Sequence, residues 1–143
     1  VGPKQTHGVG YDFIRRLKNN AKELRILGDG TQSKSYIYVD DVINAMLMTY
    51  EDSLTVGKPI FDVFNVATDD YITVTEIAEI ACRVAGLNRE DVNFQYSGGD
   101  RGWKGDVPKV LFDIEKIKKL NWKATKNSYE AIEKSIESMK AEF

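Results

Sequence analysis

The sequence predicts an α/β protein in which short strands alternate with helices. Segments rich in β-branched and aromatic residues recur between segments whose apolar residues have helical spacing, and glycine turns or helix caps separate them. The strands are few and short for a complete doubly wound sheet, so we expect a lobe rather than a whole domain of that kind. We treat residues 1–143, of which 42% are hydrophobic, as one unit with a core of its own.

Four segments have the composition of strands. Residues 24–27 end at a glycine turn, and residues 36–39 alternate in the manner of a second strand. Residues 61–66 are mostly apolar, as in a strand that is buried on both faces of a parallel sheet. Residues 92–96 form the last predicted strand, and a glycine-rich loop follows them.

Five segments are predicted to be helical. Residues 11–18 have apolar side chains at helical spacing and basic residues near the end. The later helices are indicated by side chains that accept hydrogen bonds from the free backbone N–H groups of a helix start. These predicted caps are Asp40 or Asp41, Thr73 with Glu76, Asp113, and Asn127 with Glu130.

The charge and cysteine content exclude several classes of partner. The formal net charge of −2 gives no general affinity for nucleic acid. No apolar run approaches the roughly 20 residues that a membrane span needs, so no membrane partner is expected. The single Cys82 cannot form an internal disulfide and fits a reducing compartment, which predicts a cytoplasmic location. Cys82 falls on the apolar side of its helix, where we expect a packed thiol.

Residues for redox and proton-transfer chemistry are missing from the sequence. Gly8–Phe13 is the nearest approach to a dinucleotide-binding glycine loop, but it follows no predicted strand and has Phe13 in place of the third glycine. None of the seven tyrosines has a lysine four residues later, and one histidine with one cysteine cannot form a zinc cluster. We therefore predict no catalytic residue, no cofactor site and no metal site in this chain.

The segment Gly98–Pro108 combines four glycines with two cations, Arg101 and Lys104, and with Trp103. By itself it is explained as a solvated loop around a half-buried tryptophan. It also has the composition of a ligand-binding loop, because glycine permits close backbone approach and a guanidinium can hold a phosphate through two hydrogen bonds.

Four stretches, in this order, resemble one known family: VGP, ELRILGDGTQSKSYIYVDDV, FNVATDDYITVTEIAEI and RGWKGDVPKVLFDIEKIKKLNWKA. They are similar to the C-terminal part of NAD-dependent nucleotide-sugar epimerases and dehydratases of the extended short-chain dehydrogenase type, with UDP-glucose 4-epimerase as the nearest functional relative. The resemblance covers the whole chain. It implies the C-terminal substrate-binding lobe of a Rossmann-type enzyme, cut from a longer protein, with the N-terminal dinucleotide-binding sheet missing. Residues 61–66 would then be a strand of the parent's Rossmann sheet.

The resemblance also implies a nucleotide-sugar site. The matching positions are the backbone amide of Val9 for a phosphate, Leu27 for the base, Lys34 for the diphosphate, Tyr36 beside the nucleotide, Arg101 or its competitor Lys104 for a second phosphate contact, and Asp106 for a ribose hydroxyl. The substrate expected from the family is a UDP- or dTDP-sugar. The NAD cofactor would bind the missing half, and none is expected to bind this chain.

The function implied for the intact parent is nucleotide-sugar epimerisation of the UDP-glucose 4-epimerase type, in a homodimer. A nucleotide-sugar 4,6-dehydratase or a reductase of the same family is the alternative, and a non-catalytic nucleotide-binding or interaction module is the alternative of another class. The chain alone is expected to be inactive. It is also expected to self-associate, because a separated lobe exposes apolar surface.

Overall fold

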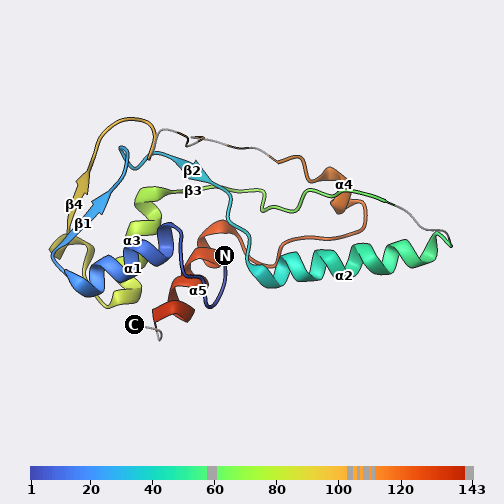
Figure 1. Cartoon of the computed structure of the whole chain (residues 1–143), viewed down its shortest axis with the longest axis horizontal. Helices are drawn as coiled ribbons and strands as arrows, with labels where there is room; N and C mark the ends of the chain where they lie inside the picture. Colours follow the sequence, from blue (N-terminus) through green and yellow to red (C-terminus); the bar gives the residue numbers. More distant parts are fainter. Residues whose placement is uncertain (58–60, 103–104, 106, 108–109, 111, 141–143) are drawn as a thin grey trace.

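The computed structural model describes residues 1–57, 61–102, 105, 107, 110 and 112–140, and the α/β class is confirmed (Figure 1). The elements in chain order are α1 (Val9–Asn19), β1 (Glu23–Ile26), β2 (Ser33–Lys34), α2 (Val39–Thr55), β3 (Ile72–Thr73), α3 (Val74–Ala85), a 3₁₀ turn η1 (Arg89–Asp91), β4 (Asn93–Tyr96), α4 (Glu115–Lys118) and α5 (Ser128–Lys140). In the described part of the chain, the four strands have two to four residues each; β1 and β4 match the strands predicted at residues 24–27 and 92–96, while the sequence does not predict β2 and β3.

The strands form two small ladders. β1 pairs in parallel with β4, so that Leu24 lies opposite Phe94, and β2 pairs antiparallel with β3, so that Lys34 lies opposite Ile72. Leu24 and Ile26 are fully buried, while the other two residues of β1 are exposed. The alternation places one face of β1 against the helices.

The main core lies where α1, α3 and α5 pack together beside the parallel ladder (Figure 1). Ile14, Ile77 and Ile136, one from each helix, have no exposed surface. The buried apolar residues of each helix recur with the helical period, which is why the sequence predicts these three helices well.

A longer arm projects from this core. Figure 1 shows α2 extending away from the compact part, with the segment before β3 and the short α4 on the same arm. A second, smaller core around Ala45, Ile117 and Trp122 holds this arm together. The remaining face of α2 is apolar and exposed, at Ile43, Met46, Leu47, Tyr50 and Leu54. Self-association through such a surface stays a prediction.

Two of the predicted helix caps are present. The predicted cap Asp113 accepts a hydrogen bond from the backbone N–H of Glu115, but the N-cap residue of α4 is Ile114 and no side chain caps this helix. Thr73 and Glu76 form a complete capping box at α3. Asn127 and Glu130 hydrogen-bond each other's backbone N–H groups in the same manner at α5, at 2.8 and 2.9 Å. Each depends on side chains within three residues of one another, so a local pattern is enough to predict it.

The predictions around the start of α2 are wrong. Residues 36–39 are not a strand: the ladder uses Ser33 and Lys34 instead, and α2 already begins at Val39. No side chain caps α2. Asp41 is buried and accepts hydrogen bonds from the backbone N–H and the hydroxyl of Thr125, at 3.0 and 2.7 Å. The sequence predicts that a carboxylate of Asp40 or Asp41 caps α2, but the Asp41 carboxylate binds a distant loop instead.

Residues 61–66 form no strand in this structure. The side chain of Phe61 is 94% exposed and that of Val63 is 64% exposed, so the expected burial on both faces is not found here. The sequence pattern is that of a strand, but the described residues provide no partner strand next to it. Pairing in a larger sheet stays a prediction.

Cys82 is fully buried in α3, as predicted, and burial raises the pKa of its thiol above the ordinary value. Thiol reagents attack the exposed thiolate. We expect native labelling of Cys82 to be on the order of 100-fold slower than labelling in denaturant, because the helix must first open. Mixing the chain with a chromogenic disulfide reagent, with and without urea, measures the ratio. Equal rates would contradict the packing of α3.

Candidate functional site

A cavity of about 440 Å³ lies between the start of α1, the strand β2 and the helix α5. Four of the predicted substrate residues line it together: Val9, Leu27, Lys34 and Tyr36. Its other lining residues include Gly8, Gln32, Ile72, Val74, Gly102, Ile132 and Ser135. Residues from five separate parts of the chain therefore line one cavity.

The start of α1 opens onto this cavity. Its N-cap residue is Gly8, with φ at +96°, and no side chain caps the helix. A helix start without a side-chain cap presents backbone N–H groups and the positive end of the helix dipole, which together favour an anion. Gly10, in the first turn, is buried, and a Cβ atom there would lie only 3.1 Å from the side chain of Ile136 in α5, so the two helices approach each other closely at this point.

Two predicted residues reach the cavity from β2 and the segment after it. Lys34 is half-buried and is held by the ladder with Ile72. Tyr36 is half-buried as well, and its backbone N–H donates to the hydroxyl of Ser128 at 2.9 Å. The first residue of α5 thus fixes the backbone that carries the aromatic side chain into the cavity wall.

A polar network stands behind this wall. The Ser128 hydroxyl lies 2.9 Å from a carboxylate oxygen of Asp70 and 2.8 Å from the hydroxyl of Thr68. Thr68 in turn bonds with Ser35, at 2.7 Å between the hydroxyls. The network ties Ser35 and Tyr36, the two residues that follow Lys34, to the start of α5.

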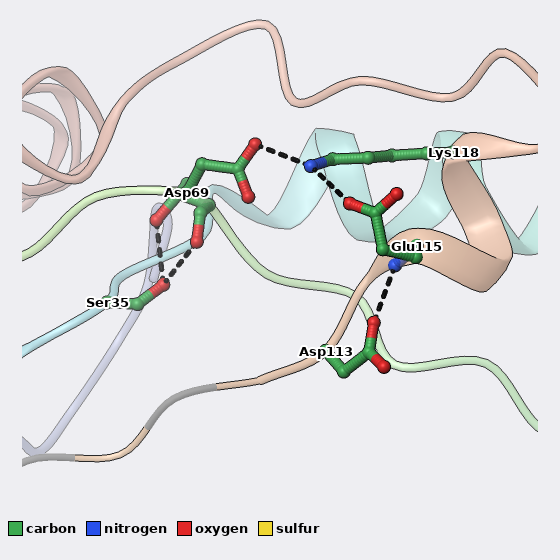
Figure 2. Close-up of polar contacts among 6 residues, drawn as sticks. Ser35, Asp69, Asp113, Glu115 and Lys118 are labelled. Carbon is green, nitrogen blue, oxygen red and sulfur yellow. Dashed lines mark hydrogen bonds and ion pairs between the residues drawn. The ribbon is translucent and has the colours of Figure 1, made fainter.

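Figure 2 shows how this region continues toward α4. The ammonium group of Lys118 lies 3.0 Å from carboxylate oxygens of both Asp69 and Glu115. The hydrogen bonds to Asp69 and then to Glu115 raise the pKa of Lys118. The three side chains are partly solvated, so they orient the loop rather than adding much stability.

Comparison with known proteins shows what this arrangement is similar to. Residues 1–67 match the model of the NAD dependent epimerase/dehydratase family. A crystal structure of UDP-galactose 4-epimerase is 32% identical and matches the whole chain with a TM-score of 0.78. The chain is therefore similar to the NAD dependent epimerase/dehydratase family over residues 1–67, and to the UDP-galactose 4-epimerase structure over its whole length.

Two further members show the same relationship. A crystal structure of UDP-glucose 4-epimerase with UDP-glucose, from Thermotoga maritima, is 29% identical over 99% of this chain, with a TM-score of 0.73. The UDP-glucuronate 4-epimerase of Thermodesulfobacterium geofontis is 29% identical over 88% of this chain. The chain covers 43% of each of the two epimerase structures and 36% of the third protein, so it spans about two fifths of the length of these relatives.

The family is NAD dependent, but the described residues do not form a dinucleotide fingerprint. Gly28 and Gly30 follow β1, yet the chain continues into β2 instead of a helix. Gly8 and Gly10 begin a helix, but no strand precedes them in residues 1–8. A pyrophosphate-binding loop needs both a strand before it and a helix after it. Neither pair of glycines therefore forms a pyrophosphate-binding loop in the described part of the chain.

Of the three remaining predicted contacts, the structure describes Arg101 alone. Arg101 is exposed and does not line the cavity, although its neighbour Gly102 does. Lys104 and Asp106 lie outside the described residues. The choice between Arg101 and Lys104 stays a prediction of the resemblance.

Sequence reasoning missed two residues of the site. Gln32 lines the cavity and is only 3% exposed, and Ser128 anchors Tyr36 from behind. The first was missed because Gln32 precedes both the predicted strand at residues 36–39 and the observed β2, so no strand period indicated the side on which it lies. The second was missed because Ser128 is 92 residues from Tyr36.

Among the described residues, no three histidine, cysteine, aspartate or glutamate side chains lie close enough to hold a metal ion. In the same part of the chain, no helix has the length and the apolar composition for a membrane crossing.

Proposed function

We propose that the cavity binds the nucleotide part of a nucleotide-sugar, and that the intact enzyme is an epimerase of the UDP-glucose 4-epimerase type. The observation that carries the proposal is that Val9, Leu27, Lys34 and Tyr36 line one cavity, together with the uncapped start of α1. The two epimerase structures support it, because one of them is a structure with UDP-glucose.

The chemistry of the cavity suits such a ligand. A diphosphate carries negative charge and hydrogen-bond acceptors, and it would meet the backbone N–H groups of Val9 and Gly10 and the ammonium of Lys34. Tyr36 and Leu27 offer apolar surface to the flat base and the ribose. These contacts are remote from the sugar carbon that reacts, so the chain contributes binding and orientation of the substrate.

The proposal extends to the arrangement of the intact enzyme. Residues 1–143 form the substrate-binding lobe, NAD and the reacting groups belong to the rest of the enzyme, and residues 61–66 join its sheet. The chain alone is proposed to be inactive, and its location to be cytoplasmic. A dehydratase or a reductase of the same family would use this cavity in the same way.

Replacing Lys34 with alanine is expected to weaken UDP binding by about 10- to 100-fold, because a charge-assisted contact to phosphate contributes roughly 1.5–3 kcal/mol. Lys34→Arg keeps the charge and should retain most of the affinity. Isothermal titration of the 143-residue chain with UDP measures both. Lys119→Ala removes an exposed lysine that does not line the cavity, and it should leave binding unchanged.

Parallel titrations with UDP, dTDP and NAD test the proposed function as a whole. Binding of a pyrimidine diphosphate without binding of NAD is the expected result. Binding of NAD would overturn the division of roles between this chain and the rest of the enzyme. Absence of any nucleotide binding would favour the non-catalytic module.

A further inference from the structure

Gln32 is a buried polar side chain without a partner. It is 3% exposed, and neither its amide nitrogen nor its amide oxygen has a hydrogen-bond partner among the described residues. Native proteins seldom leave a buried amide unsatisfied, because both of its polar atoms lose their water. Since Gln32 lines the 440 Å³ cavity, the missing partner can come from a ligand there.

The surroundings hold the amide in place. The backbone oxygen of Gln32 accepts from the N–H of Val74 at 3.0 Å, next to the β2–β3 ladder. A Cβ atom at Gly28 would overlap the amide group of Gln32, so this glycine leaves the space that the amide fills. Gly28 also has φ at +80°, which a glycine adopts without strain. The backbone of Gln32 is thus held beside the ladder, and its amide fills the space next to Gly28.

The unsatisfied amide nitrogen and oxygen of Gln32 indicate which chemical group of a ligand can bind to them. A carboxamide offers one donor beside one acceptor in a plane, so it needs a partner with an acceptor beside a donor. A phosphate offers acceptors only and would leave the amide oxygen unsatisfied. The neighbouring lining residues Leu27, Ile72 and Val74 are apolar, which suits a flat ring with apolar faces and a polar edge better than a hydroxyl-covered sugar.

We propose that Gln32 hydrogen-bonds the imide edge of a pyrimidine base, with its amide N–H donating to a ring carbonyl and its amide oxygen accepting from the ring N3–H. Uracil and thymine carry this edge. The inference rests on the proposed function, since it names the part of the nucleotide that this residue contacts. It adds a base-reading side chain to a cavity whose other proposed polar groups serve the diphosphate.

The test compares UDP with N3-methyl-UDP, in which the ring N3–H is blocked, on the wild-type chain and on Gln32→Met. Wild type is expected to bind UDP about tenfold or more tightly than N3-methyl-UDP, as two hydrogen bonds imply. Gln32→Met should bind both weakly and equally. Its thermal midpoint without ligand should rise, because the variant no longer buries two unsatisfied atoms.

Each other outcome contradicts one named claim: the contact to the base, the role of Gln32 or the proposed function. If wild type binds UDP and N3-methyl-UDP equally, the proposed contact to the base is wrong, and this conclusion does not depend on any variant. Equal binding of UDP by wild type and a folded Gln32→Met removes the role of Gln32 while leaving the proposed function standing. A loss in Gln32→Met that disappears with 2′-deoxy-UDP would assign the amide to the ribose instead. Failure of wild type to bind UDP at all overturns the proposed function and this inference with it.

Discussion

The Gly30→Ala variant is expected to lose about 2–5 kcal/mol of unfolding free energy. Gly30 has φ at +84°, and a side chain in this left-handed region costs about 1–2 kcal/mol. A Cβ atom here would also overlap the hydroxyl of Thr75 and the ring of Tyr96, and such overpacking costs about 1–3 kcal/mol more. Thr75 is held by two hydrogen bonds to the Gly30 carbonyl, both at 3.2 Å, so it cannot move without losing them.

Gly86→Ala separates the two contributions. Gly86 ends α3 with φ at +78°, but a Cβ atom there meets nothing within 4 Å. This variant should therefore show only the backbone cost, about 1–2 kcal/mol. Urea unfolding followed by circular dichroism measures both. If Gly30→Ala is no less stable than Gly86→Ala, the close contact of the Gly28–Gly30 turn with α3 and β4 is wrong.

The Ser128→Ala variant is expected to have the second large effect: it should lower both the free energy of unfolding and the affinity for UDP. The buried hydroxyl accepts from the backbone N–H of Tyr36 and also bonds with Asp70 and Thr68. Without it, the N–H of Tyr36 loses its acceptor, and orphaning a buried group costs about 1–3 kcal/mol. Thr68 keeps its bond to Ser35, so the rest of the network limits the damage.

The binding effect follows from the position of Tyr36 in the cavity wall. Once its backbone is released, UDP affinity should fall by several-fold, because the ligand must then order the segment itself. Ser138→Ala is the matched control in α5, since its hydroxyl donates only to a carbonyl of its own helix, at 2.7 Å. It should change stability by no more than about 0.5 kcal/mol. If a destabilised Ser128→Ala variant keeps full UDP affinity, the polar network around Ser128 does not support the binding site.

The candidate site was predictable in part. The positions of Val9, Leu27, Lys34 and Tyr36 came from the resemblance to the family, and the structure brings the four together at one cavity. It does not bring Arg101 there. A glycine-rich loop has many accessible backbone conformations, so its composition indicates ligand binding without placing any single side chain.

The sequence by itself determined what depends on neighbours along the chain. The helices α1, α3 and α5, the capping box of Thr73 and Glu76, and the burial of Cys82 follow from periodicity and from side chains a few residues apart. Such patterns act within one or two helical turns, so they survive in any surroundings.

Only the tertiary structure decided the rest. Asp41 is bound by Thr125, 84 residues away, and not by its own helix, and Tyr36 is held by Ser128 instead of by a neighbouring strand. The pattern of residues 61–66 indicates a strand, but a strand requires a partner that the described residues do not supply. A side chain or backbone group with several potential partners takes the one that folding brings nearest, because a buried polar group must be satisfied from wherever a partner is available.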